Sequence, residues 1–247
     1  RKGGNNRVIL ATDGDFNVGL SSESELVKLI ESYRNRGVYL SVLGFGTGNY
    51  KDAKMEALAD KGNGNFAYID SVEEARKVLI EEMGATLLTA AKDVKLQVEF
   101  DPAVVKSWRL IGYENRILAK EDFTDDKKDA GEMGAGHRVT ALYEIEPVSP
   151  APGAGLGILR VRYKKPDQDQ SAQLELALAD ARGSLSNASG DLRFAAAVAA
   201  YGMILRGSEH RGRADWKLVL DLARGAAGES DRRAEFVTLA EKASGLK

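Results

Sequence analysis

The 247-residue sequence contains no cysteine and only two histidines. Disulfide frameworks, thiolate zinc sites and cysteine nucleophiles are therefore excluded. His137 and His210 lie far apart in the sequence and lack the spacing of metal ligands, so we expect both at the surface. A cysteine-free chain is compatible with a cytoplasm and with an envelope compartment, so this absence does not indicate where the protein works.

The sequence also lacks an excess of charge of one sign and a long hydrophobic run. Its 35 Lys and Arg residues oppose 37 Asp and Glu residues, which gives no electrostatic reason to expect binding to nucleic acid or to an anionic membrane. The longest apolar stretch, residues 194–205, is too short to cross a bilayer. No export signal is visible, but because the chain opens on Arg1 rather than on Met, this absence has little weight.

The composition is that of a globular protein, with 43% hydrophobic and 29% charged residues. The first ninety residues alternate between strand and helix patterns. The expected strands are residues 7–12, 38–43 and 65–69. The expected helices are residues 22–36, 52–61 and 71–91, the first and last opening on capping boxes (Ser22 with Glu25, Ser71 with Glu74). This alternation predicts a parallel sheet with right-handed crossovers, a partial doubly wound, Rossmann-like α/β fold.

After residue 92 the pattern changes to strict alternation of apolar and polar residues. Val94, Leu96, Val98 and Phe100 are typical of a half-buried antiparallel strand. Further strands are expected at 104–118, 138–146, 156–163 and 173–179, separated by loops at 125–136, 147–155 and 165–170. Helices are expected at 191–206 and after the capping residues Asp215 and Ser230. We therefore divide the chain into residues 1–91 and residues 92–247, of which 92–182 form a β-sandwich-like region and 190–247 are mostly helical.

Ligands of an open parallel sheet bind outside the carboxyl ends of its strands. Three loops leave such ends, at residues 12–15, 44–49 and 70–71. Asp13 is the best candidate, because a carboxylate at the end of a strand, beside a glycine that lets other groups approach, suits a cation such as Mg²⁺. The alternative is structural: Asp13 and Asp15 could make turns or cap the next helix, and the residue pattern favours neither interpretation.

Other chemistries have weaker support. Gly44, Gly46 and Gly48 invite a dinucleotide-binding interpretation, but Asn49 stands where the third glycine belongs. Asp13 could also be the nucleophile of an aspartyl phosphotransferase, which would need Lys and carboxylate groups that the sequence does not place. Three aromatic residues, Trp108, Tyr113 and Phe123, are expected to pack in the core or at hinges rather than to form a stacking platform.

Longer runs of residues resemble a known family. The run RVILATDGDFNVG, residues 7–19, resembles the second half of a von Willebrand factor type A domain. The runs LSVLGFGTGNY (40–50) and MEALAD (55–60) are similar to one bacterial branch of that family, in which the domain is joined to a characteristic C-terminal region. Residues 91–100, 109–116 and 134–145 resemble that C-terminal region, so the resemblance covers nearly the whole chain.

This resemblance implies a metal-ion-dependent adhesion site at the carboxyl edge of a doubly wound sheet. In the family the site consists of an Asp-x-Ser-x-Ser loop, a Thr from a middle loop and an Asp after the fourth strand. Only the last of these maps onto this chain, at Asp13, so the chain is expected to lack the N-terminal half of the type A domain. We therefore expect Mg²⁺ or another divalent cation in the intact protein and an incomplete site, without bound metal, in this chain alone.

The resemblance further implies a non-enzymatic, adhesion-type module that binds a protein partner in the cell envelope or periplasm. An upstream lipid anchor would be its link to a membrane, and nucleic acid is not an expected partner. The strand at 7–12 would lie beside the missing first strand, so its edge could support self-association. Two alternatives remain: a metal-dependent phosphoryl-transfer enzyme, and a purely structural assembly protein that makes its contacts through residues 92–247.

Overall fold

The computed structural model describes residues 4, 6–13, 23–46, 52–113, 117–128, 130–148, 153, 155–181, 183–228 and 230–246, and the observations below refer to these residues. The chain divides into two compact units. The first unit comprises Arg1–Gln97, Leu118–Arg138 and Arg160–Glu175. The second unit comprises Val98–Ile117, Val139–Leu159 and Leu176–Lys247.

A three-stranded parallel sheet lies in the first unit. Its strands are β1 (Asn6–Thr12), β2 (Val38–Phe45) and β3 (Phe66–Ile69), in the order β1-β2-β3. The predicted strands and their parallel direction are thus confirmed. Among the described residues β1 pairs with β2 and with no other strand. Val8 and Ile9, which point to opposite faces of β1, are 51% and 39% exposed.

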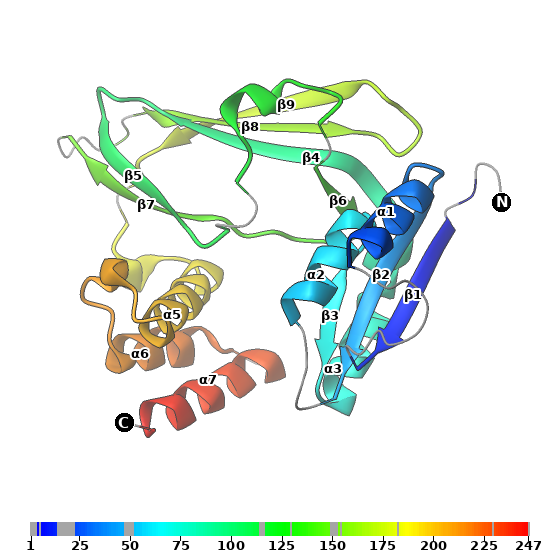
Figure 1. Ribbon diagram of the computed structural model, residues 1–247. Coiled ribbons are helices and arrows are strands. Elements are labelled where there is room, and N and C mark those ends of the chain that lie inside the picture. Colours follow the sequence, from blue (N-terminus) through cyan, green and yellow to red (C-terminus); the bar gives the residue numbers. More distant parts are fainter. Residues whose placement is uncertain are drawn as a thin grey trace. The chain divides into compact units, whose positions relative to one another are not determined.

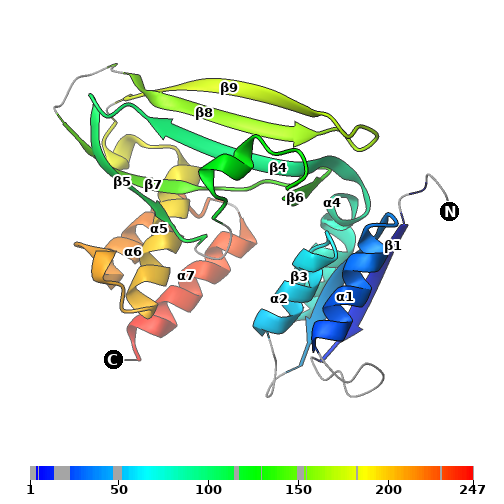
Figure 2. The same ribbon diagram turned by 45° about the horizontal axis from the view of Figure 1, so that its top comes forward.

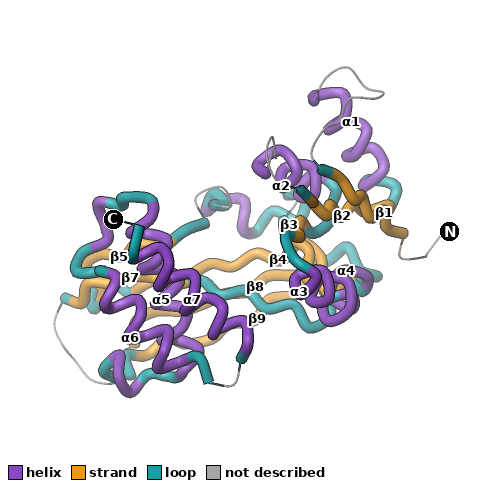
Figure 3. The backbone as a smooth tube through the Cα atoms, turned by 90° about the horizontal axis from the view of Figure 1, so that it is seen from below, coloured by secondary structure: helices purple, strands orange, loops and turns teal. Residues whose placement is uncertain are grey.

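Helices cover both faces of this sheet, as expected for a doubly wound arrangement (Figures 1 and 3). Helices α1 (Glu23–Arg34) and α2 (Asp52–Lys61) lie on one face, where Ile30 and Met55 pack with Val42 of β2. Helix α3 (Val72–Arg76) and the π-helical turn η1 (Lys77–Glu81) lie on the other face. There, Leu43 and Ile69 pack with Val78. The predicted cap at Ser22 lies outside the described residues.

The turn between α2 and β3 is pressed against β2. A Cβ atom at Gly64 would lie 1.8 Å from the carbonyl oxygen of Leu40, so this position requires glycine. Leu40 N–H donates to the carbonyl oxygen of Gly62 at 2.9 Å, and Val42 N–H donates to that of Asn65, also at 2.9 Å. The close approach lets β3 begin directly beside the middle of β2.

The predicted long helix at 71–91 is wrong in its second half. The capping box is confirmed, because Glu74 N–H donates to the Ser71 side chain at 3.1 Å. Beyond it the helix breaks into η1 and the short helix α4 (Met83–Leu87), and strand β4 (Thr89–Phe100) already begins at Thr89. The start of β4 pairs with β6 (Gly131–Gly134), in a segment predicted to be a loop, so a second correction concerns residues 125–136. This pairing, which lies beyond the reach of local sequence patterns, decides the conformation of 89–91.

Two further sheets follow, as the alternating sequence predicts. A four-stranded sheet has the order β6-β4-β8-β9, with β8 at Gly155–Lys164 and β9 at Ser171–Ala179. An antiparallel pair is formed by β5 (Val105–Ile111) and β7 (Leu142–Pro147), both shorter than predicted. In the second unit the Phe100 ring of β4 contacts Trp108 of β5 and Tyr143 of β7, with ring centroids 5.6 Å apart in each pair. The sandwich-like expectation therefore holds where these two sheets meet.

Three helices end the second unit: α5 (Gly190–Leu205), α6 (Trp216–Ala226) and α7 (Asp231–Ser244) (Figure 2). Ala200, Val219 and Ala240 form their common core. The predicted cap at Asp215 is confirmed, whereas Ser230 makes no capping hydrogen bond with its side chain. Short 3-10 turns complete the fold at Lys120–Phe123 (η2), Leu185–Asn187 (η3) and Glu209–Arg211 (η4). No described helix combines the length and the apolar character needed to cross a membrane.

Candidate functional site at the carboxyl edge of the parallel sheet

The carboxyl ends of the three parallel strands meet at one edge, as their common direction requires. Thr12 lies beside Gly44 in the register of β1 and β2, and Phe45 lies beside Ile69 in that of β2 and β3. Asp13, Gly46 and Asp70 directly follow β1, β2 and β3. The edge that the sequence predicts as the ligand-binding side is therefore formed by these neighbouring strand ends.

Asp13 is exposed and lies beside the glycine loop that follows β2. A Cβ atom added at Gly46 would be 3.8 Å from the Cβ atom of Asp13, so the two residues are neighbours across the edge. Gly46 has a φ of +98°, a backbone conformation that favours glycine. The Tyr68 hydroxyl of β3 donates to the Gly46 carbonyl oxygen at 2.6 Å and so holds Gly46 against β3.

The described residues alone do not fit a complete metal site. No group of three or more His, Asp and Glu side chains within them could hold a metal ion. Asp13 would supply one carboxylate ligand, and Asp15 and Gly48, which the sequence also places at this edge, lie outside the described residues. Among the described residues, the chemistry of this edge therefore rests on two exposed carboxylates, Asp13 and Asp70, with Gly46 beside Asp13.

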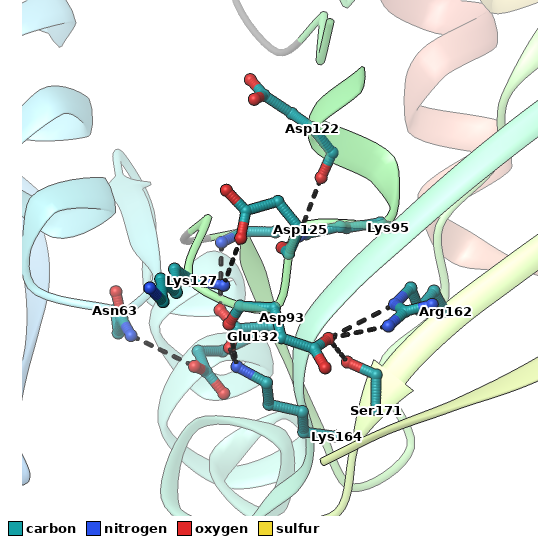
Figure 4. Close-up of polar contacts among 12 residues, drawn as sticks. Asn63, Asp93, Lys95, Asp122, Asp125, Lys127, Glu132, Arg162, Lys164 and Ser171 are labelled. Carbon is teal, nitrogen blue, oxygen red and sulfur yellow. Dashed lines mark hydrogen bonds and ion pairs between the residues drawn. The ribbon is translucent and has the colours of Figure 1, made fainter. Parts of the chain in front are cut away.

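A second polar group, which sequence reasoning missed, lies elsewhere in the first unit (Figure 4). We call it the lysine cluster, and it consists of Asp93, Lys95, Asp126, Arg162, Lys164 and Ser171. Its two lysines are buried, with 4% of Lys95 and 9% of Lys164 exposed. Buried ammonium groups are rare unless they are paired, so we expect each lysine to be bonded to neighbouring groups.

Each lysine binds the backbone of the loop that contains η2. Lys95 Nζ donates to the carbonyl oxygens of Asp122, at 3.1 Å, and Asp125. Lys164 Nζ donates to the Asp126 carbonyl oxygen at 2.7 Å and to Asp93 Oδ2 at 2.6 Å. Burial by itself would lower the pKa of Lys164, but the hydrogen bond and charge of Asp93 raise it above its usual value. The lysine therefore remains charged and holds the loop in place.

The Asp126 carboxylate completes the lysine cluster. It accepts hydrogen bonds from the Ser171 hydroxyl and from Arg162, whose Nη2 atom lies 3.0 Å from Oδ1. These bonds, first that of Ser171 and then that of Arg162, lower the pKa of the Asp126 carboxyl. Asp93 has a φ of +49° and accepts a 3.1 Å hydrogen bond from Ala130 N–H. The only sequence signal for this group is the presence of four acidic residues among residues 121–126, which by itself would suggest a solvated loop.

The remaining predicted residues do not join either group. Both histidines are exposed, as expected, and they belong to different units. Phe123 is buried and Tyr113 donates its hydroxyl hydrogen to the Thr140 carbonyl oxygen at 2.9 Å, in agreement with packing roles. The prediction for Trp108 is only partly right, because its ring packs against Phe100 and Tyr143 but the residue is 55% exposed and so does not lie in the core.

Comparison with solved structures gives distant similarities. The chain is similar to a von Willebrand factor type A protein from Catenulispora acidiphila, with a TM-score of 0.45 and 17% sequence identity, over 96% of this chain and 57% of that chain. It is also similar to the human COPII-coat protein Sec24c, with a TM-score of 0.42 and 13% identity, over 90% of this chain and 32% of that chain. Similarities at this level do not assign a function.

Comparison with known sequences is more specific. The chain is 43% identical over 262 aligned residues to "Uncharacterized protein YfbK" of Escherichia coli (strain K12). This match covers 99% of the chain and 46% of the relative, so the chain spans about half the length of the relative that it matches. Residues 85–246 match the family model described as "Uncharacterized protein YfbK, C-terminal". Because this match takes in well over half of the sequence, the chain belongs to the family of YfbK C-terminal regions.

Proposed function

We propose that the chain is part of a non-enzymatic, adhesion-type module that binds a protein partner through the carboxyl edge of its parallel sheet. The observation that carries this proposal is the position of Asp13, exposed at the end of β1 beside the Gly46 loop. A carboxylate in this position can accept a cation or a basic group, and the missing side chain of Gly46 leaves room for a partner. The resemblance of residues 7–19 to a type A domain supports the same edge.

In the intact protein, Asp13 ligates Mg²⁺ or another divalent cation together with ligands that the described residues do not supply. The resemblance implies that these ligands come from an Asp-x-Ser-x-Ser loop and a Thr. An exposed Asp or Glu of the partner would complete the coordination, because hard cations prefer oxygen ligands. The partner is therefore a protein that presents an accessible carboxylate.

The experiment that tests this proposal is a calorimetric Mg²⁺ titration of the intact protein and of its Asp13→Ala variant. Asp70→Ala is the matched control, because Asp70 is an exposed carboxylate that follows β3 at the same edge. We expect Asp13→Ala to weaken Mg²⁺ binding by more than about tenfold, since the loss of even an outer-sphere partner typically weakens metal binding by about 10–100-fold. Asp70→Ala should bind as the parent does. An unchanged affinity in the Asp13→Ala variant would overturn the assignment.

Phosphoryl transfer is the alternative that also uses Asp13, in this case as a nucleophile. Such chemistry needs a cationic group near the carboxylate to stabilise the phosphate. Lys95 and Lys164, the buried lysines of the described residues, are occupied within the lysine cluster and are therefore not available for this role. We expect no turnover of p-nitrophenyl phosphate with Mg²⁺. Turnover that Asp13→Asn abolishes would replace our proposal with this one.

A purely structural assembly role is separated from the binding role by the same variant. Partner capture that survives Asp13→Ala would show that the contacts do not depend on Asp13, as the structural alternative through residues 92–247 expects. We further propose a location in the cell envelope, which rests on the resemblance alone. Cell fractionation with detection of the protein in the envelope or periplasmic fraction would support it, and recovery in the cytoplasmic fraction would oppose it.

A further inference from the structure

The two faces of the four-stranded sheet differ sharply in polarity. On β8, Arg160 bonds Glu175 at 3.0 Å, and Arg162 and Lys164 bond members of the lysine cluster. Because successive side chains of a strand point to opposite faces, Val161 and Tyr163 lie on the face opposite to these three cations. The cationic side chains are thus gathered on one face of β8.

The neighbouring strands repeat this division. On β9, Ser171 bonds Asp126 and Glu175 bonds Arg160, so Ala172 and Leu174 lie on the opposite face. On β4, Lys95 reaches the loop that contains η2, so Val94 and Leu96 point the other way. Six residues of the first unit share this second face, and we call them the apolar sheet face: Val94, Leu96, Val161, Tyr163, Ala172 and Leu174. On β9 the same alternation continues with Leu176, which is 61% exposed.

The exposure of the two faces is the reverse of the usual pattern. Lys95 and Lys164 on the polar face are 4% and 9% exposed, because the loop with η2 covers them. Leu96 and Leu174 on the apolar sheet face are 53% and 58% exposed. A sheet that is apolar on one side is normally completed by a second layer packed about 10 Å away. Within the first unit, the described residues leave these two leucines without such a layer.

The size of the apolar sheet face indicates what kind of layer covers it. Three strands about 4.8 Å apart, with two inward residues each, span roughly 200 Å². A stable contact between separate proteins needs about 800 Å² on each partner, so this face, even when Leu176 is added to it, is too small to hold a second copy by itself. A covering segment of the same polypeptide faces no such requirement, because its tether gives it a high local concentration. The E. coli relative has such additional length, since the chain spans 46% of it.

We propose that the apolar sheet face is the inner face of a β-sandwich and is covered by strands of the same polypeptide that lie outside residues 1–247. This inference is independent of the proposed function, because it concerns a surface formed by β4, β8 and β9 and not the edge at Asp13. It assigns a folding role to part of the additional length found in the relative. Residues 1–247 would then complete their first unit only in the presence of that segment.

The absence of cysteine from residues 1–247 makes this proposal directly testable by maleimide labelling. A single cysteine is introduced by Leu174→Cys, and separately by Gln173→Cys, whose side chain lies on the polar face of the same strand and is exposed. Both variants are prepared in residues 1–247 and in the longer polypeptide, in which any other cysteine is replaced by serine. The comparison is between the labelling rates at the same position in the two lengths of chain.

We expect Leu174→Cys to label more than about tenfold more slowly in the longer polypeptide, because a buried thiol reacts only when the covering layer opens. The rate at Gln173→Cys should change less than about twofold, because its face is not covered. Hydrogen exchange of the β9 amides in the unsubstituted proteins gives a second readout that does not depend on the substitutions. Equal rates at Leu174→Cys in both lengths would overturn the proposal. Protection within residues 1–247 that disappears on dilution would overturn it in favour of a second copy.

Discussion

Replacing Lys164 with methionine should destabilise the first unit by about 3 kcal/mol. The substitution keeps most of the length of the side chain but removes two hydrogen bonds, one to Asp93 and one to the Asp126 carbonyl oxygen. The side chains of the ion pair are only 11% and 16% exposed. Breaking one partner of a buried pair costs about 3–5 kcal/mol. We expect the lower end of this range, because Asp93 keeps its hydrogen bond from Ala130 N–H.

Hydrogen exchange is the appropriate assay, because both tryptophans, Trp108 and Trp216, belong to the second unit and their fluorescence does not report on this site. A loss of 3 kcal/mol corresponds to roughly a hundredfold faster exchange of the Ala130 amide. Lys165→Met is the matched control, since it removes the neighbouring lysine, which is exposed. Surface substitutions of this kind usually change stability by less than about 0.5 kcal/mol.

A second substitution separates the buried charge from the lost packing. Asp93→Asn in the Lys164→Met background removes the unpaired carboxylate, and asparagine tolerates the φ of +49° at this position. We expect this double variant to recover about 1–2 kcal/mol, because the larger part of the cost lies in the orphaned charge. Equal losses in the Lys164→Met and Lys165→Met variants, or a loss below about 1 kcal/mol in the former, would refute the assigned role of the ion pair.

Three further predictions concern other parts of the fold. Gly64→Ala should lower the free energy of unfolding, measured in urea, by about 3 kcal/mol or more, because its Cβ atom would overlap the Leu40 carbonyl group. The control is Gly84→Ala, where a Cβ atom meets nothing within 4 Å, and this variant should be neutral or stabilising. The Asp126 carboxyl has a lowered pKa, so its contribution to stability is present above the usual value of 3.8 and is lost as the pH falls below that value. We therefore expect amide exchange in the loop with η2 to increase in acid, and Asp126→Asn should remove this increase. Asp215→Ala should cost about 1 kcal/mol in unfolding followed by Trp216 fluorescence, because Leu218 N–H loses its 2.7 Å bond, whereas Ser230→Ala should have little effect.

The parallel sheet and the candidate edge could be predicted from the sequence because their signals are local. Residues 7–12 and 38–43 form nearly continuous apolar runs, and the position of Asp13 follows from the end of the first run. Parallel direction then brings Asp13 and Gly46 to the same edge without any knowledge of side-chain contacts. Their placement therefore required only periodicity and topology.

The parts that could not be predicted depend on contacts between residues distant in the sequence. Residues 89–91 continue a helical pattern, but they form a strand because they pair with β6, about forty residues later. The four-residue strand β6 begins and ends with glycine and has no strand pattern of its own. The sequence around Lys95 and Lys164 gives no sign that these lysines are buried. They are buried because the loop with η2 lies across them in the folded protein.

The way in which Lys95 holds the loop with η2 affects how freely that loop can vary. Lys95 binds the carbonyl oxygens of Asp122 and Asp125, not their carboxylates. Every amino acid provides a carbonyl oxygen, so the side chains at these two positions can change while their attachment to β4 is preserved. A substitution at either position would break only the local contacts of the two carboxylates, that of Asp122 with Lys128 at 2.8 Å and that of Asp125 Oδ1 with Lys127 N–H at 2.8 Å, and not the attachment of the loop to β4.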